Sequence, residues 1–120
     1  MKPKVYIIDD DEIMSHLLSG YIKDISNPII FRDAISAISS IEDDKPKLIF
    51  LDILLNGPDG FTFLNEIVSY EDTAKIPIVI ISSLNLDIDK LENYGVVKIL
   101  NKESFTPEDV KKIATEVLNG

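Results

Sequence analysis

Five side chains of this sequence could act together chemically, and each follows an apolar run of the chain: Asp9, Asp10, Asp52, Ser82 and Lys102. Grouped carboxylates repel one another, by about 4 kcal/mol per pair at ~4 Å and an effective dielectric near 20. A cation would relieve this repulsion, and oxygen ligands suit a hard divalent ion such as Mg²⁺. A carboxylate beside such a metal and a lysine is a known type of phosphoryl acceptor. The side chains therefore indicate metal-assisted phosphoryl transfer if the fold brings them together.

Apolar runs predict the strands that must position these groups. The run at residues 48–52 is continuous, which is typical of a strand buried on both faces, and turn-forming residues follow it at 57–60. Lys98 interrupts the last run, as expected of an edge strand with one solvated face. Strands are expected at residues 5–8, 28–31, 48–52, 76–81 and 96–100.

Apolar residues at helical spacing between these runs predict five helices, centred on residues 13–25, 34–41, 61–68, 84–91 and 110–118. Asp33 and Thr106 are expected N-caps, and Gly95 is an expected C-cap. Core contact with the sheet is expected of the whole first stripe, Ile13, Met14, Leu17, Leu18, Tyr21, Ile22 and Ile25, and the third helix should present Phe61, Leu64, Ile67 and Val68. Alternating strands and helices predict a parallel sheet covered on both faces.

Composition limits the class of protein. With 120 residues, one domain over residues 1–120 is expected. The net charge of −9, from 12 basic and 21 acidic residues, argues against direct nucleic-acid binding. No apolar run approaches the roughly 18 residues that cross a membrane, and the start of the chain does not look like a signal peptide. A soluble cytoplasmic protein without disulfides is expected.

The motifs resemble those of a response-regulator receiver domain of two-component signalling, similar to the stand-alone chemotaxis regulators, over essentially the whole chain. They are Ile8-Asp9-Asp10-Asp11, Leu51-Asp52 followed by Pro58-Asp59-Gly60, Ile80-Ile81-Ser82-Ser83, and Gly95 with Lys102. The resemblance implies an α/β, flavodoxin-like, doubly wound sheet of five parallel strands in the order 2-1-3-4-5, with five helices.

The resemblance also implies a role for each site residue. Asp52 would be the phosphoacceptor. The metal, Mg²⁺ or Mn²⁺, would be bound by Asp10, Asp52 and the main-chain carbonyl of Leu54, with Asp9 acting through a bound water.

Other residues would bind the phosphoryl group or modulate its lifetime. Ser82 would be the switch hydroxyl, paired with Lys102, and Ser83 would border the phosphate. Leu54 and Leu84 would flank the path of a hydrolytic water, and because both are apolar the phosphoryl group should be lost slowly. Ile99 occupies the position of the family's switch aromatic residue.

The implied partners are a sensor histidine kinase or a histidine phosphotransfer protein. The chain would not be an enzyme, although it would assist its own phosphorylation and dephosphorylation. The signal would be read by a homodimer or a downstream protein at the face of the fourth helix and fifth strand, without nucleic acid or membrane contact. The only histidine, His16, is expected to be exposed, within the surface that a kinase contacts.

Two alternatives stay open. One is a pseudo-receiver, an interaction module that is not phosphorylated, because Asn56 and Glu103 stand where the family usually has proline. The other is a phosphatase-like or nucleotide-binding α/β enzyme. The second is disfavoured by the lack of a glycine-rich phosphate loop and by Leu54, which stands where a second aspartate would be needed.

Overall fold

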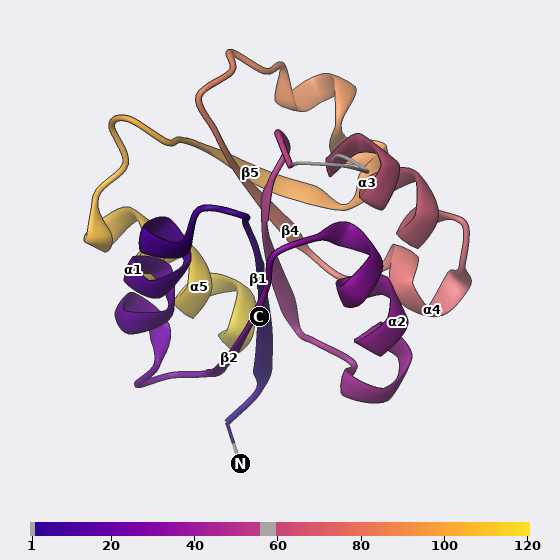
Figure 1. Ribbon diagram of the computed structural model, residues 1–120, viewed down its shortest axis with the longest axis horizontal. Helices are drawn as coiled ribbons and strands as arrows, with labels where there is room; N and C mark the ends of the chain where they lie inside the picture. The colour runs from indigo at the N-terminus through magenta and orange to yellow at the C-terminus, as the bar shows by residue number, and fades with distance from the viewer. Residues whose placement is uncertain (1, 56–59) are drawn as a thin grey trace.

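One sheet of five parallel strands forms the centre of the molecule (Figure 1). The computed structural model describes residues 2–55 and 60–120. The strands lie in the order β2-β1-β3-β4-β5, which confirms the expected topology. Their bounds are β1 Lys4–Ile8, β2 Asn27–Phe31, β3 Leu48–Asp52, β4 Ile78–Ser82 and β5 Val96–Asn101.

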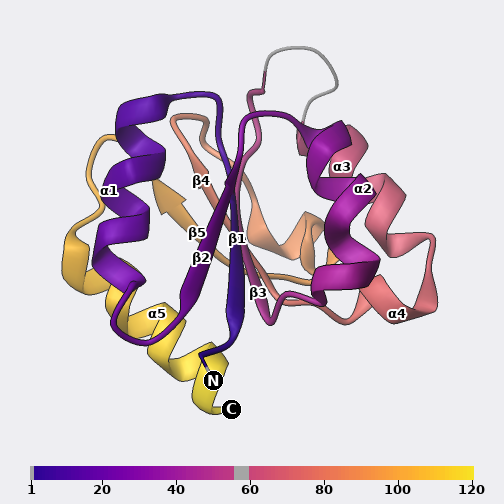
Figure 2. The same cartoon turned by 60° about the horizontal axis from the view of Figure 1, so that its bottom comes forward.

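Helices cover both faces of the sheet (Figure 2). One face packs against α1 (Glu12–Ile22) and α5 (Pro107–Asn119). The other packs against α2 (Ala34–Asp44) and α3 (Gly60–Val68), and the short α4 (Glu71–Ala74) follows α3. Two apolar cores result because successive side chains of a strand point to opposite faces. Along β1, Tyr6 and Ile8 join one core while Val5 and Ile7 join the other.

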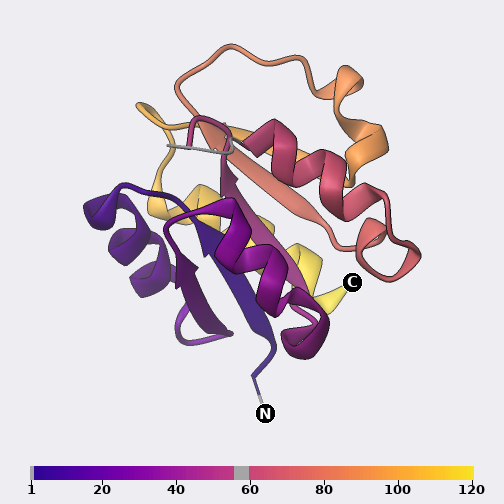
Figure 3. The ribbon, with the colours of Figure 1, turned by 45° about the vertical axis from the view of Figure 1, so that its right-hand side comes forward.

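β3 lies between β1 and β4, and all five of its residues are buried. The long apolar run predicted this, since a central parallel strand has helices above and below it. β5 lies at the edge of the sheet with Lys98 exposed, as expected of an edge strand. The chain leaves β1, β3, β4 and β5 at one edge of the sheet, opposite the N-terminus (Figure 3).

The prediction that the whole apolar stripe of α1 contacts the sheet is wrong. Leu18 and Ile22 are buried, but 75% of Ile13 and 44% of Leu17 are exposed, and Ile25 lies beyond the helix and is also exposed. The stripe is wider than the strip of helix surface that β1, β2 and α5 can cover, so its outer residues face solvent.

The third helix is in the predicted place, but its buried face differs from the prediction. Phe63 is fully buried together with Leu64 and Ile67, whereas Phe61 is 39% exposed. The expected face was built on Phe61, which shares helical spacing with Leu64. Packing of the helix against the residues that follow β3 instead turns Phe63 inward.

The segment between β4 and β5 is not the predicted α-helix. It forms two 3₁₀ turns, η1 (Ile88–Lys90) and η2 (Glu92–Tyr94), and Leu91 between them is buried. The side chain of Asp87 accepts a hydrogen bond from the N–H of Asp89, an interaction that competes with a regular helix. The described chain still has five α-helices because the unpredicted α4 lies between α3 and β4.

Predicted caps are present at three positions. Asp33 caps α2 by accepting from the N–H of Ser36, and Thr106 forms a capping box with Asp109 at the start of α5. Gly95 ends η2 with φ of 81°, a conformation that favours glycine. No helix among the described residues is long and apolar enough to cross a bilayer.

Candidate functional site

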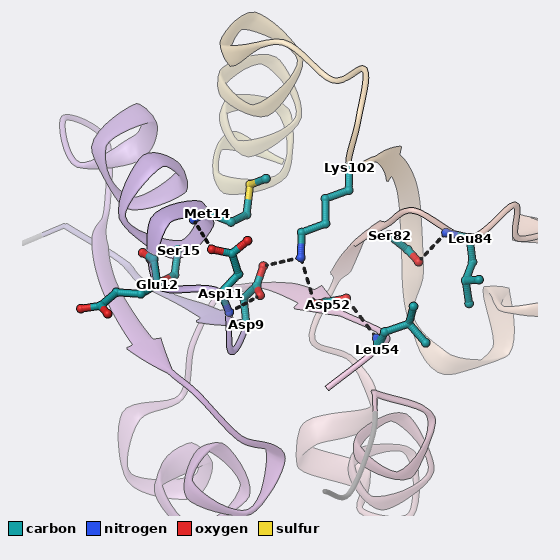
Figure 4. A network of polar contacts seen from close by, with 10 residues as sticks. All are labelled: Asp9, Asp11, Glu12, Met14, Ser15, Asp52, Leu54, Ser82, Leu84 and Lys102. Atoms are coloured by element: carbon teal, nitrogen blue, oxygen red, sulfur yellow. Dashed lines mark hydrogen bonds and ion pairs between the residues drawn. The ribbon is translucent and has the colours of Figure 1, made fainter. Parts of the chain in front are cut away.

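The five predicted side chains come from the carboxyl ends of β1, β3, β4 and β5, as a parallel sheet requires. In Figure 4 the side chains of Asp9 and Asp52 both point toward the ammonium group of Lys102. Ser82 lies on the far side of Asp52 and points toward Leu84. The site therefore contains a cluster of charges with a neighbouring hydroxyl group.

Asp52 is the last residue of β3, and its side chain is only 5% exposed. One carboxylate oxygen, Oδ1, accepts a hydrogen bond of 3.0 Å from the N–H of Leu54. The other, Oδ2, accepts one of 3.1 Å from Nζ of Lys102. Both oxygens of the carboxylate are thus held, one by the backbone and one by a charged side chain that sits 50 residues away in sequence.

Gly60 supports this end of β3, although the sequence indicated only a turn residue there. Its N–H donates to the carbonyl of Ile53 at 3.0 Å. A Cβ atom at position 60 would lie 2.6 Å from Cα of Ile53 and 3.0 Å from the carbonyl oxygen of Asp52. Only glycine allows α3 to approach the residue after Asp52 so closely.

Asp9 follows β1 directly, and its side chain is 2% exposed. Its Oδ1 accepts from the N–H of Asp11 at 2.9 Å. Its Oδ2 lies 3.4 Å from Nζ of Lys102 but has no hydrogen-bond donor among the described residues. Asp9 and Lys102 therefore form an ion pair without a hydrogen bond. Asp9 therefore carries an incompletely satisfied buried oxygen.

The pKa of Asp9 is raised to about 6, mainly by burial and also by the nearby carboxylate of Asp52. The N–H of Asp11 and the ammonium of Lys102 oppose this increase without cancelling it. Burial lowers the pKa of Lys102, but its contacts with Asp52 and Asp9 outweigh burial and raise it overall. The ammonium is held charged between two acids.

The donor set fits a hard divalent cation. Asp9, Asp10 and Asp52 each offer a carboxylate oxygen, and these oxygens lie within 4.8 Å of one another. Two of these carboxylates, Asp9 and Asp52, share the ammonium of Lys102, and Oδ2 of Asp9 lacks a hydrogen-bond donor among the described residues. Oxygen ligands with excess negative charge suit Mg²⁺ or Mn²⁺. The predicted third direct protein ligand, the main-chain carbonyl of Leu54, stays a prediction, as does the role of Asp9 through a water.

Ser82 is completely buried at the end of β4. Its hydroxyl oxygen accepts a hydrogen bond of 3.0 Å from the N–H of Leu84, and its carbonyl accepts from the N–H of Lys102 at 2.9 Å. No contact in the described part of the chain joins this hydroxyl to Asp52. Ser83 is exposed. The assignment of both serines to phosphate binding therefore stays a prediction, and Ser82 would have to leave Leu84 to fulfil it.

Two leucines follow the site residues on neighbouring loops: Leu54 lies beside Asp52, and Leu84 lies beside Ser82 (Figure 4). Leu54 is 51% exposed and Leu84 is 41% exposed. That they border the path of a hydrolytic water to Asp52 stays a prediction. Ile99 is half-buried farther along β5, and with Leu84 and Ile88 it lines a groove of about 360 Å³.

Asn101 was not singled out from the sequence, yet it shapes the turn that carries Lys102. Its side-chain oxygen accepts from the N–H of Glu103 at 2.8 Å, and its carbonyl accepts from the N–H of Phe105 at 3.0 Å. No cis peptide bond occurs in the described residues, so the Lys102–Glu103 bond is trans. The sequence signal that could have identified this turn is the polar side chain of Asn101 directly before Lys102. Asn56, which differs from the family's usual proline, lies outside the described residues. So do the predicted turn residues Gly57, Pro58 and Asp59.

The start of α1 lies beside the acids. Asp11 is the N-cap of this helix, and its side chain accepts from the N–H of Met14 at 3.1 Å. His16 is exposed, as predicted, and it lines a shallow hollow of about 460 Å³ with Ile13 and Leu17.

Known proteins share the sequence pattern and the fold of this chain. The family described as "Response regulator receiver domain" matches residues 5–115. The DNA-binding dual master transcriptional regulator RpaA of Synechocystis is 32% identical over 123 residues, covering 96% of this chain and 47% of that protein. The transcriptional regulatory protein BaeR of Escherichia coli is 31% identical over 90 residues, covering 74% of this chain and 36% of that protein. The chain thus spans less than half the length of these two relatives.

Solved structures share the fold. Chemotaxis protein CheY4 of Vibrio cholerae superimposes with a TM-score of 0.86 at 21% identity, covering 98% of this chain and all of that one. NtrX of Brucella abortus gives a TM-score of 0.83 at 27% identity, covering 99% of this chain and 27% of that one. At 21% identity, the likeness to CheY4 is evidence for the fold alone.

Proposed function

The chain belongs to the response-regulator receiver domain family, and on that premise we propose that it is a signalling switch controlled by phosphorylation of Asp52. The observation that carries the proposal is the carboxylate of Asp52, which is buried, fixed at a strand end and within 3.1 Å of Lys102. Asp9 and Asp10 supply further carboxylate oxygens within 4.8 Å. Asp52 would accept the phosphoryl group, Lys102 would offset its negative charge, and Asp9 and Asp10 would help to hold a metal ion beside it.

The phosphoryl donor in this proposal is a phosphohistidine. A carboxylate oxygen of Asp52 forms a bond to phosphorus while the bond from phosphorus to the histidine nitrogen breaks. The nitrogen keeps the electron pair and takes up a proton, and Asp52 becomes an acyl phosphate. A divalent ion held by Asp10, Asp52 and the carbonyl of Leu54, with Asp9 acting through a water, would neutralise charge on the transferring group. Lys102 would contribute its fixed positive charge to the same oxygens.

The exposed face of α1 supports docking of the donor protein. Ile13 and Leu17 are exposed apolar residues next to His16, and α1 begins three residues after Asp9. A helical donor, in a sensor histidine kinase or a phosphotransfer protein, would bury these side chains against its own apolar face. The proposal includes a cytoplasmic location, where ATP supplies such kinases.

The readout proposed for phosphorylation lies around β5. A phosphoryl group adds about −1.5 to −2 charge and strong acceptor oxygens. The hydroxyl of Ser82 would exchange the N–H of Leu84 for one of these oxygens, which would alter the loop leading to η1 and the packing of Ile99. A homodimer or a downstream protein would then contact β5 and the two 3₁₀ turns, which replace the expected fourth helix. Any catalysis by the chain would be limited to gaining and losing its own phosphoryl group.

The test is phosphorylation by a small donor. Incubation with acetyl phosphate and Mg²⁺ should add one phosphoryl group to the intact chain, detected by mass spectrometry, and Asp52→Asn should stay unmodified. Beryllofluoride with Mg²⁺ should shift the NMR signals of residues near Asp52 and Ser82 in the wild type only.

Two results would overturn the proposal. If neither the mass nor the NMR spectrum of the wild type changes at millimolar Mg²⁺, the chain would be a pseudo-receiver that is not phosphorylated. Undiminished labelling of Asp52→Asn would mean that the acceptor is another residue. If the switch is supported, a phosphotransfer profile against purified histidine kinases would identify the donor.

A further inference from the structure

A second concave region lies at the opposite end of the sheet from Asp52. The cavity has a volume of about 590 Å³ and lies between the end of α2 and the connection from α4 to β4. Its lining residues directly precede β3 and β4, whereas Asp52 and Ser82 end those strands. It is therefore separate from the phosphorylation site, and its volume is in the range of small-molecule sites.

The inner wall of this cavity is apolar and rigid. Ile41 is 4% exposed and Pro46 is buried, and Ile76 and Pro77 are half-buried on the opposite side. Thr73 also lines the cavity, but its hydroxyl already donates to the carbonyl of Ile67. Pro46 and Pro77 have fixed φ angles, which limits the backbone freedom of both walls.

Three lysines surround the apolar wall. Lys45 and Lys47 flank Pro46 on one side, and Lys75 comes from the other side. None of the three has an ion-pair partner among the residues that the structure describes, whereas Lys4, Arg32 and Lys102 do. The cavity therefore gathers three of the chain's 12 basic residues, none of them held in an ion pair among the described residues, in a chain of net charge −9.

Lys45 also has an unusual backbone conformation. With φ of 50°, it is the only non-glycine residue in the left-handed region within the described chain. It ends α2, a position where glycine is the usual residue. A lysine there gains from the helix dipole, but the dipole does not account for Lys47 or Lys75. The strain is tolerated at a position that sets a positive charge at the rim.

We propose that this cavity binds a small organic anion with an apolar body and a carboxylate or phosphate head. The apolar wall would receive the body, and lysines from both sides would bind the head. Glu42 and Asp72 also line the cavity and reduce its formal charge from +3 to +1. This balance favours a head with one or two negative charges over a polyphosphate. The proposal does not depend on phosphorylation of Asp52.

The experiment is a ¹H–¹⁵N NMR titration of the unphosphorylated chain with two probes, octanoate and octyl phosphate, which separate a carboxylate source from a phosphate source. Octanol matches the apolar body without charge, and inorganic phosphate matches the head without the body. We expect one or both amphiphilic anions to shift amides of residues 41–47 and 72–77, with at least tenfold weaker binding of both controls.

Variants test the role of the lysines. The double variant Lys45→Gln with Lys75→Gln removes one charge from each side and should weaken binding about tenfold. The matched pair Lys111→Gln with Lys112→Gln, on exposed positions of α5, should change it less than twofold. Lys45→Gly relieves the left-handed strain, so it should fold at least as well as the wild type and still bind about threefold more weakly.

Three outcomes would overturn the proposal. The first would be that neither amphiphilic anion shifts the amide signals of residues 41–47 and 72–77 at millimolar concentration, or that the shifts map to the Asp52 edge. The second would be that octanol binds as well as octanoate, which would mean an apolar groove without anion recognition. The third would be that the lysine variants bind like the wild type, which would remove the assigned contacts.

Discussion

The two halves of the candidate site differ in how completely they are assembled. The acid half, Asp9, Asp52 and Lys102, is buried and joined by contacts of 3.1 and 3.4 Å. In the switch half, Ser82 and Ile99, the serine hydroxyl is bound to the backbone of Leu84 rather than to Asp52. The difference suggests that binding and transfer need little rearrangement, while signal output requires the switch half to move.

The positions of the strands explain this difference. β3 is central and fully buried, so packing on both faces fixes Asp52. β5 is an edge strand, and the connection from β4 to it consists of 3₁₀ turns with one buried anchor, Leu91. Segments with few buried contacts rearrange at low free-energy cost. The predictions below test whether the acid half is rigid and the switch half responsive.

The largest expected effect is on the support of the acid half. Gly60→Ala would place a Cβ 2.6 Å from Cα of Ile53, so the chain after Asp52 must shift. We expect a loss of about 3 kcal/mol in unfolding free energy, together with weaker labelling by acetyl phosphate. Gly20→Ala is the matched control because no heavy atom lies within 4 Å of its added Cβ, and helix propensity favours alanine. Equal urea midpoints for the two variants would contradict a rigid acid half.

The next effect concerns the buried charge of Asp9. Because the pKa of Asp9 is raised from 3.8 to about 6, the folded chain binds this proton more tightly than the unfolded chain. The stability that Asp9 contributes is therefore complete below about pH 4 and is lost as pH rises to about 6. Asp9→Asn avoids this loss, and without metal at pH 7 it should be ~1–2 kcal/mol more stable than the wild type, measured by urea unfolding across pH 4–7.

Metal should shift this difference in stability toward the wild type. Millimolar Mg²⁺ stabilises whichever form binds it in the folded state, so the wild type should gain more unfolding free energy than Asp9→Asn. A variant less stable than the wild type at pH 7 without metal would show that the contact with Lys102 outweighs the burial of Asp9.

A smaller effect is expected in the switch half. Ser82→Ala removes the acceptor of the Leu84 N–H and should lower the unfolding free energy by about 1 kcal/mol. Asp52 should still be labelled, but beryllofluoride should no longer change amide exchange in residues 84–94. Ser83→Ala, at an exposed position, should preserve that response. An unaltered response in Ser82→Ala would exclude its hydroxyl as the link.

The smallest expected effect is on the rate at which Asp52 loses its phosphoryl group, and it involves one leucine from each half of the site. Leu54 follows Asp52 and Leu84 follows Ser82, both as apolar, half-exposed side chains, and we expect each to keep hydrolytic water from the acyl phosphate. Loss of the phosphoryl group from the wild type should take longer than minutes at room temperature. Leu54→Asn or Leu84→Asn should accelerate it about threefold, or ~0.7 kcal/mol in the barrier. Ile35→Asn, an exposed apolar position on α2, should have no effect on the decay followed by mass spectrometry.

Much of the architecture follows from local patterns. Continuous apolar runs predicted the five strands and the central position of Leu48–Asp52, because only a strand covered on both faces is apolar throughout. The capping residues Asp33 and Thr106 act through hydrogen bonds to backbone groups three residues away, so they are visible in the sequence. Strand ends on one edge then place Asp9, Asp52 and Lys102 together without further information.

What the sequence alone determined is thus the set of groups at the carboxyl edge, since parallel strands bring their ends together whatever the details of packing. The tertiary structure decided which apolar residues are covered: Phe63 rather than Phe61 is buried, and Ile13 is exposed. It also decided that two short 3₁₀ turns, within residues 88–94, replace the expected helix and that the hydroxyl of Ser82 binds the N–H of Leu84. These outcomes depend on contacts between segments distant in sequence, such as the approach of Gly60 to Ile53, which no local pattern encodes.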